Sequence, residues 1–257
     1  MSVSHQRMAR QTRDATYYDG LWGEQLAQAD LVVPPDDELV GQDLGHLLVY
    51  MWTRLGDLSG TRLLELGCGS GDYTVMLARR GAHITASDIS RQAGWYIRAR
   101  ADVNGVAERV QFCLANTETL PFADRSFDLV VGFGVLHHLN LNTATPEIRR
   151  VLRSGGRAVF REPMRGSWLL EFARNHLPYR QKNRSPNEAP LTYEMIGAVG
   201  THFRRTHIRE MYLLSMVGRA LGSEVNWTWL WRWDEWLLRR IPALRRWCRY
   251  AVIEYCV

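Results

Sequence analysis

Residues Glu65 to Gly71 combine a carboxylate with glycines at alternating positions, a pattern that can bind a charged ligand. An apolar run over 63–66 leads into them, and a helical pattern follows over 72–78. This order predicts a strand, a tight turn and a helix, with glycine wherever the backbone needs positive φ or touches a ligand. The start of the helix adds unpaired N–H groups. A carboxylate at this place repels a pyrophosphate and suits an ammonium or sulfonium group. The spacing also differs from the Gly-x-Gly-x-x-Gly of dinucleotide-binding folds.

Further polar residues follow the ends of other predicted strands. Asp88 closes a strand over 82–88, and an acid at that place can accept hydrogen bonds from ribose hydroxyls. Strands are also expected over 109–114, 126–133 and 157–161. The remaining residues at or just beyond strand ends are Asn116, Phe133, His137, His138 and Glu162. Strands that alternate with helices predict a doubly wound α/β sheet, and ligands of such sheets bind at the carboxyl ends of the strands.

Helix signals separate these strands. The expected helices span 12–29, 37–57, 90–105 and 146–152. Ser90 is the predicted cap of the third helix, and Pro146 is expected to start the fourth. The second helix has leucine and methionine at spacings of three and four, at positions 44, 47, 48, 51 and 55, which predicts one buried face.

Four stretches together resemble the class I S-adenosylmethionine (SAM)-dependent methyltransferases. They are LLELGCGSGDYT, ASDIS, LPFADRSFDLVVGFGVLHHL and VLRSGGRAVFREP. The first contains the family's Glu/Asp-x-Gly-x-Gly-x-Gly motif, and the match covers about residues 60–163. The resemblance is to the type 11, small-molecule subgroup, which includes the ubiquinone/menaquinone methyltransferases.

The resemblance implies a Rossmann-like, doubly wound, seven-stranded sheet whose last strand is antiparallel and inserts beside the fifth. We expect a single SAM-methyltransferase domain over 1–257. Its parts are an N-terminal helical lid over 1–58, a core sheet over 59–213, a helical insertion over 214–248 and a closing strand over 249–257. A capped helix over 192–200 and strands over 203–213 and 250–256 fit this outline.

The resemblance also implies which residues hold SAM. Gly67, Cys68 and Gly69 would line the methionine part with Gly71 in the same loop, and Glu65 would lie near the amino group. Asp88 would hold the ribose hydroxyls, and Ile89 would pack on adenine. The adenine edge would meet Asn116, where the family usually has Asp, and Thr117. Phe133 would place backbone atoms near the methionine, and Tyr18 belongs to an aromatic group, with Tyr17 and Trp22, that forms either a lid over SAM or a staple between helix and sheet.

Methyl transfer is an in-line displacement that mainly requires positioning and exclusion of water. A general base is needed only for an acceptor that arrives protonated. The candidates for that role are His137, His138 and Glu162. The histidines could instead shape the pocket wall, and Glu162 could be a capping or arginine-pairing acid. No metal is expected, because the four cysteines show no metal-ligand spacing.

Residues 214–248 carry six of the ten tryptophans, and arginines follow closely. On a helix, Trp227, Leu230, Trp231, Leu237, Leu238, Ile241 and Leu244 would gather on one side. Three interpretations remain open. The segment could pack its tryptophans onto the domain as a cap, lie on an anionic membrane surface or guide an apolar substrate, or bind RNA through stacked aromatics.

Composition limits the remaining choices. The chain has 257 residues and a net charge of +5, with Lys182 its only lysine. It has no apolar run long enough to span a membrane and no apolar signal-peptide core, so a cytoplasmic protein is expected, with peripheral contact at the inner membrane face through 214–248 as an option. The predicted function is methyl transfer from SAM to O, N or C of a small apolar or amphipathic acceptor. The alternatives are an RNA or protein methyltransferase and a SAM-binding non-catalytic subunit. No DNA partner is expected, and the oligomeric state is left open.

Overall fold

The computed structural model describes residues 3–26, 30–35, 38, 45–165, 190–215 and 229–257. Within them the chain forms a seven-stranded sheet in the order β3-β2-β1-β4-β5-β7-β6. The strands are β1 Arg62–Leu66, β2 His83–Asp88, β3 Val110–Leu114, β4 Phe127–Phe133, β5 Leu152–Pro163, β6 Arg205–Met211 and β7 Tyr250–Cys256. β7 runs antiparallel to β5 and β6, and the pairs among the first five strands are parallel. The predicted Rossmann-like sheet with an antiparallel last strand is confirmed.

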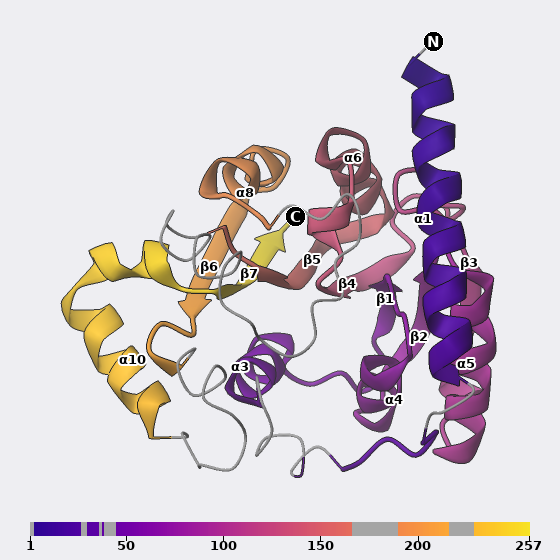
Figure 1. Ribbon diagram of the computed structural model, residues 1–257, viewed down its shortest axis with the longest axis horizontal. Helices are drawn as coiled ribbons and strands as arrows, with labels where there is room; N and C mark the ends of the chain where they lie inside the picture. The colour runs from indigo at the N-terminus through magenta and orange to yellow at the C-terminus, as the bar shows by residue number, and fades with distance from the viewer. Residues whose placement is uncertain (1–2, 27–29, 36–37, 39–44, 166–189, 216–228) are drawn as a thin grey trace.

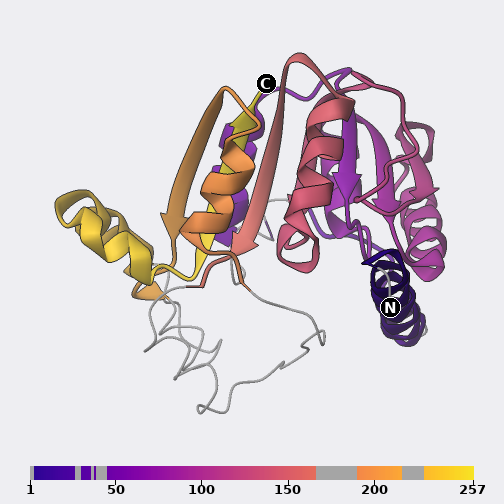
Figure 2. The ribbon, with the colours of Figure 1, turned by 90° about the horizontal axis from the view of Figure 1, so that it is seen from above.

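Helices cover both faces of this sheet (Figures 1 and 2). The α-helices are α1 Val3–Leu26, α3 Gly45–Leu55, α4 Asp72–Arg79, α5 Arg91–Val103, α6 Leu141–Val151, α8 Tyr193–Gly200 and α10 Leu230–Arg240. The short 3-10 helices are η1 Ala107–Arg109, η2 Leu136–His138 and η3 Pro242–Trp247. α3, α4 and α5 pack on one face, and α6 and α8 pack on the other. α1 lies beside α5 at the β3 end of the sheet, and α10 lies at the β6 end.

The apolar spacing of α3 positions that helix on the sheet. Leu47, Leu48, Met51 and Leu55 are all buried, in the same core as the inner strands. The predicted partner Leu44 lies outside the described residues. α3 ends at Leu55 because the next residue is a glycine with a φ of 69°, a conformation that terminates helices readily.

α6 differs from its prediction. The expectation that Pro146 starts this helix is wrong, because α6 begins at Leu141 and Pro146 lies inside it. The Asn140 side chain accepts the backbone N–H of Asn142, and this cap starts the helix before the proline is reached. Pro146 therefore removes one backbone hydrogen bond from the middle of α6.

Two other elements begin earlier than predicted. α1 starts at Val3, because residues 3–11 contain neither the glycine nor the proline that would stop a helix. β5 starts at Leu152 rather than Arg157, and its register against β4 shifts over the residues between them. Gly155, with a φ of 73°, lies in that irregularity, so the predicted glycine turn is a bulge within a longer strand.

α10 is held to the sheet by a buried carboxylate and by contact with α3. Asp234 accepts backbone N–H groups of Leu213 and Leu214, just after β6. The Trp231 ring lies 4.6 Å from the ring of His46 on α3. None of the helices in the described ranges is long and apolar enough to cross a membrane.

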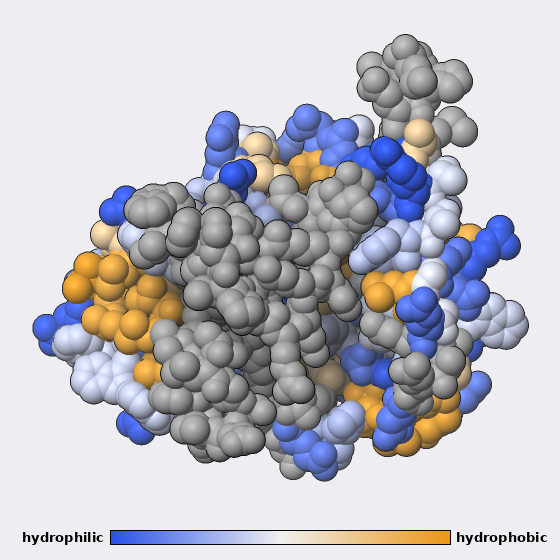
Figure 3. All heavy atoms as spheres, in the orientation of Figure 1, coloured by the Kyte–Doolittle hydropathy of each residue, from blue (hydrophilic) through white to orange (hydrophobic). Residues whose placement is uncertain are grey.

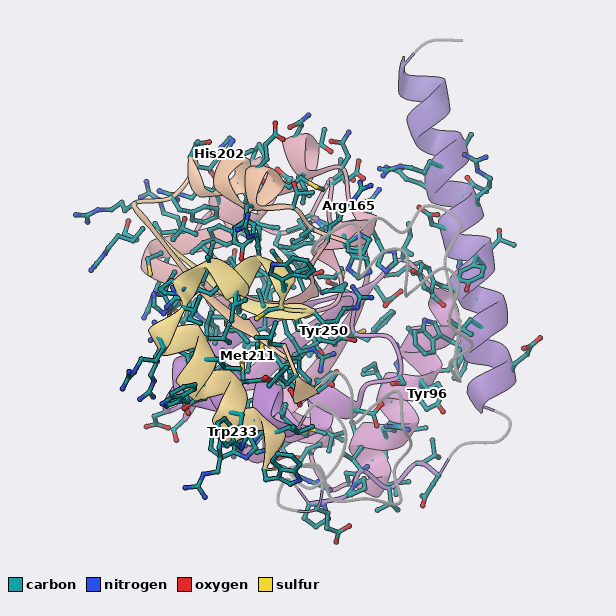
Figure 4. The ribbon with its side chains drawn as sticks, turned by 60° about the vertical axis from the view of Figure 1, so that its left-hand side comes forward. Tyr96, Arg165, His202, Met211, Trp233 and Tyr250 are labelled. Atoms are coloured by element: carbon teal, nitrogen blue, oxygen red, sulfur yellow. The ribbon has the colours of Figure 1, made fainter. Side chains whose placement is uncertain are left out.

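The opposite side of α10 faces solvent. Trp229, Trp233 and Trp236 are 51%, 52% and 50% exposed, and Figure 4 labels Trp233 on α10, which lies in front of the strands in that view. The prediction that Ile241 joins the inward side is wrong, because it is 48% exposed. Its φ of −129° takes it out of the helix. Trp227 lies outside the described residues.

A buried ion-pair network fastens α3 to strands β5 and β7. Glu254 on β7 is 4% exposed and pairs with Arg54 of α3 and Arg157 of β5. The Arg157 guanidinium also donates to the backbone carbonyls of Arg54 and Leu55, the last residues of α3. Two cations thus share one carboxylate, and the end of the helix is tied to the same group.

Replacing Glu254 by Ala is expected to lower the free energy of unfolding by about 3–5 kcal/mol, because two partly buried guanidinium groups lose their counter-charge. Glu108 is the matched control, since its side chain is 67% exposed and pairs with Arg109. Glu108→Ala should change the free energy by less than about 1 kcal/mol. Urea unfolding measures both, and equal losses would contradict the buried-network interpretation.

Candidate functional site

The turn after β1 forms the centre of the site. Gly67 and Gly69 have φ values of 63° and 51°, in the left-handed region that favours glycine. A Cβ atom on Gly67 would lie 2.7 Å from Val135 Cγ2, and one on Gly69 would lie 2.8 Å from Trp22 Cζ2. Backbone conformation and close packing therefore both require glycine here. Gly71 ends the turn as the N-cap residue of α4.

Asp88, at the end of β2, connects this turn to the start of α5. Its Oδ2 accepts the backbone N–H of Gly69, and its Oδ1 accepts that of Ser90, both at 2.9 Å. Ser90 also caps α5, as predicted. Burial raises the pKa of the Asp88 carboxyl, and the two N–H donors oppose that rise. Each oxygen keeps a second lone-pair direction for another donor. Ile89 follows directly and is half-buried.

Glu65 lies behind the turn. It is 1% exposed, and its Oε2 accepts the Thr74 hydroxyl of α4 at 2.5 Å. Burial raises the pKa of Glu65 to about 8, and the nearby charges of Asp88 and Asp72 add to the rise. A cation nearby would favour the ionised form again. Cys68 is also buried, and burial raises the pKa of its thiol.

The loop after β3 adds a polar corner. Asn116 Oδ1 accepts the backbone N–H of Glu118 at 2.9 Å, and Thr117 between them is buried. Glu118, to which the sequence assigned no role, is also buried. It pairs with Arg10 of α1 and accepts the Thr143 hydroxyl of α6.

α1 crosses the site and carries the predicted aromatic group. Trp22 lies against Gly69, and the Tyr18 and Trp22 rings are stacked at 6.4 Å. The Tyr18 hydroxyl lies 3.4 Å from the ring nitrogens of His138. Asp19 accepts the Ser90 hydroxyl at 2.5 Å. The indole N–H of Trp22 is buried and has no acceptor among the described residues, so a polar donor is available where α1 covers the turn.

Beyond β4, a second buried carboxylate organises η2. Glu162, at the end of β5, is fully buried. Its Oε1 accepts the N–H groups of Val135 and Leu136 at 2.9 and 2.8 Å, and its Oε2 lies 2.7 Å from His137 Nδ1. A carboxylate opposite Nδ1 places the imidazole proton there and makes Nε2 the basic nitrogen. His138 is neutral, because burial and the neighbouring His137 lower its pKa to about 3.

An aromatic wall closes the β4 side. Tyr73, near the start of α4, stacks on Phe133 with ring centroids 3.8 Å apart and an interplanar angle of 5°. Arg161 of β5 lies over both rings. Phe133 was predicted from its place at a strand end, whereas Tyr73 and Arg161 were missed. Arg161 is the last residue of the strand predicted over 157–161, so its position at a strand end was the available signal.

The edge of the sheet therefore collects the predicted residues, because parallel register aligns the ends of β1, β2 and β4. The sequence did not predict a role for Asp19 of α1, because no motif in its own segment includes it. In the described ranges, no group of three or more His, Cys, Asp and Glu side chains could hold a metal ion.

The comparisons with known proteins match the part of the chain that carries this site. A family model described as "Methyltransferase domain" matches residues 64–160, from β1 to β5. The ubiquinone/menaquinone biosynthesis C-methyltransferase UbiE of Xylella fastidiosa is 33% identical over 180 residues, which cover 60% of this chain and 70% of that protein. UbiE of Bartonella bacilliformis is 32% identical over 135 residues, or 51% of this chain and 48% of that one. The chain spans about half the length of the first curated relatives it matches.

Solved structures share the fold over nearly the whole chain. The geranyl diphosphate C-methyltransferase of Streptomyces coelicolor A3(2) superposes with a TM-score of 0.63 at 17% identity and covers 96% of this chain and 97% of its own. A putative sarcosine dimethylglycine methyltransferase of Galdieria sulphuraria gives 0.60 at 16% identity, with 93% and 97% covered. Since the motif, the sheet and the Xylella relative agree, this protein belongs to the class I SAM-dependent methyltransferases of the methyltransferase-domain family.

Proposed function

We propose that this protein transfers the methyl group of SAM to an oxygen, nitrogen or carbon atom of a small apolar or amphipathic acceptor. One observation carries the proposal. The Asp88 carboxylate, held by the N–H groups of Gly69 and Ser90, has lone pairs left for the two ribose hydroxyls of the cofactor. Family membership supports the reaction class. The quinone-pathway names of the relatives favour an apolar acceptor.

The residues around the turn fit the rest of SAM. The methionine part would lie along Gly67, Cys68 and Gly69, and its ammonium group would supply a cation for the buried Glu65, which has none among the described residues. The Trp22 N–H, which has no acceptor among the described residues, would gain one on the ligand.

The other predicted contacts complete this placement. Adenine would pack on Ile89, and its edge would meet Asn116 and Thr117. Phe133 would offer backbone atoms to the methionine part, and Tyr18 would cover the site from α1.

SAM supplies an electrophilic methyl group on a sulfonium, and the chain's own residues position the acceptor and exclude water. α1 would cover the turn, and the Tyr73–Phe133 stack would form one wall of the reaction space. Where the acceptor carries a proton, His137 is the proposed base, because Glu162 Oε2 lies 2.7 Å from its Nδ1 and orients the ring. His138 is the weaker base, because its pKa is lowered to about 3.

The α10 surface suits a membrane, and we propose an anionic bilayer as its occupant. Trp229, Trp233 and Trp236 occupy positions four and three residues apart, which places them on one side of the helix. Trp233 and Trp236 also contact each other edge to face. A groove of about 280 Å³ on the same helix is lined partly by arginines, namely Arg232, Arg239 and Arg240.

Figure 3 shows an apolar patch at the end of the molecule where α10 and η3 lie. Tryptophan favours the interface between water and lipid, and arginine favours anionic headgroups. This proposal concerns where the protein works, and it leaves the assigned reaction unchanged.

Replacing Asp88 by Ala is expected to abolish measurable binding of S-adenosylhomocysteine, because the turn loses its anchor and the ribose loses its acceptor. Asp102→Ala on the exposed side of α5 is the control and should bind like wild type. Titration calorimetry measures both. If Asp88→Ala bound with wild-type affinity, the proposed cofactor site would be wrong.

For an acceptor that arrives protonated, replacing His137 by Ala is expected to slow methyl transfer about 10²–10⁴-fold, the usual contribution of a general base. The same change at His138 should cost only a few-fold. The assay follows label from methyl-labelled SAM into the organic phase of an extract of the producing cells, with S-adenosylhomocysteine affinity as the control. Rates within a few-fold of wild type for both variants would exclude both histidines as the base. Label only in the macromolecular fraction would favour an RNA or protein acceptor.

Replacing Trp233 and Trp236 together by Ala, or Arg239 and Arg240 together by Glu, is expected to reduce flotation with vesicles that contain phosphatidylglycerol. Each arginine near an anionic surface contributes about 1 kcal/mol. Trp95→Ala is the matched control, since Trp95 of α5 is 63% exposed at the other end of the sheet. Equal flotation of all variants, or equal flotation on neutral vesicles, would contradict the proposal.

A further inference from the structure

Arg161 occupies a particular place on the sheet. It lies on β5 between Phe133 of β4 and Val252 of β7 in the strand register. Its guanidinium carbon lies 4.9 Å from the centroid of the Tyr73 ring and 5.5 Å from that of Phe133. Its Nη1 donates to the Tyr73 hydroxyl at 2.5 Å. The guanidinium is thus held in one orientation by two stacked rings and one hydrogen bond.

Among the residues that the structure describes, no carboxylate balances the charge of Arg161. Several other partly buried arginines of the described chain do have one. For example, Arg54 and Arg157 pair with Glu254, and Arg100 pairs with Asp72. Arg161 is also half-buried, yet no carboxylate of the described residues lies within 4.0 Å of it. A guanidinium has five N–H donors, and a partly desolvated cation is stabilised by an anionic partner.

The surroundings of Arg161 place this cation beside the proposed reaction space. The backbone carbonyl of Arg161 accepts the N–H of Gly134 at 2.7 Å, directly after β4. Tyr73 belongs to the first turn of α4, which follows the glycine turn. An anion bound to this guanidinium would therefore lie near both the methionine part of the cofactor and the acceptor.

We propose that Arg161 and Tyr73 form an anion-binding subsite that takes a carboxylate or phosphate group next to the methyl-transfer position. The inference rests on the proposed function for its location. The planar guanidinium matches the two oxygens of a carboxylate or phosphate. The Tyr73 hydroxyl accepts from Arg161 and can donate its own proton to the same anion. The anion belongs either to the methionine end of SAM or to the acceptor.

Titration calorimetry on Arg161→Gln, Arg161→Lys and Tyr73→Phe separates the two sources. If the anion is the cofactor carboxylate, Arg161→Gln lowers the affinity for S-adenosylhomocysteine at least tenfold. The affinity for 5′-methylthioadenosine, which has no amino-acid end, then stays unchanged. If the anion belongs to the acceptor, both nucleosides bind as in wild type. Pyrophosphate then binds the S-adenosylhomocysteine-saturated wild type, and Arg161→Gln loses that binding at least tenfold. In either case Arg161→Lys and Tyr73→Phe should lose less affinity for the probe than Arg161→Gln, because each variant keeps part of the site.

Arg153→Gln is the matched control, an exposed arginine on the same strand whose side chain pairs with Asp128. Thermal unfolding checks that each variant is folded, and Arg161→Lys carries the test if Arg161→Gln does not fold. The inference is overturned if Arg161→Gln changes the affinity for neither S-adenosylhomocysteine nor pyrophosphate, or if it lowers the affinities for both nucleosides equally. It is also overturned if Arg153→Gln has the same effect. A wild type that binds no S-adenosylhomocysteine would contradict the proposed function instead. Pyrophosphate binding to the unliganded protein would then decide the subsite by itself.

Discussion

The hydrogen bonds to the Asp88 carboxylate are the constraint on which the site depends. One oxygen holds the turn after β1, and the other holds the start of α5. A buried carboxylate must be compensated, and here the compensating donors are the backbone groups that define the shape of the edge. Glu162 repeats the arrangement around η2. Two buried acids, Asp88 and Glu162, thus build the two sides of the site by accepting main-chain N–H groups.

α1 completes the site through contacts that link it to several elements. Arg10 reaches Glu118 after β3, Asp19 reaches the cap of α5, and Tyr18 reaches His138. Each contact is polar or aromatic, and none belongs to the two cores that hold the sheet. The helix is therefore fastened at its polar and aromatic points, while the sheet below it is fixed by burial of apolar side chains. The edge of the sheet that carries the site is therefore supported by the two apolar cores and covered by α1.

The sequence predicted those parts of the molecule that depend on local pattern. The buried strands, the glycine turn and the Ser90 cap follow from apolar runs, from backbone conformation and from side-chain capping. The start of α6 was misplaced because Asn140 and Pro146 both signal a helix start, and only the fold shows which one applies. Arg161, Tyr73, Asp19 and Glu118 acquire their roles from partners far along the chain. On α10, Trp231 packs inward and Trp233 faces out. The cap interpretation applies to the inward side, and the proposed membrane contact would use the other side.

The order of the strands has a consequence for biosynthesis. β7 is the last strand along the chain, yet it lies inside the sheet between β5 and β6. β6 pairs with no other strand in the described chain, so it cannot join the sheet while β7 is still within the ribosome. The nascent protein therefore carries an open edge on β5 until translation has passed β7, and such unpaired edges are where nascent chains associate wrongly. The half of the sheet with the glycine turn can form early, whereas the half with Arg161 and Glu162 is completed only after β7 has left the ribosome.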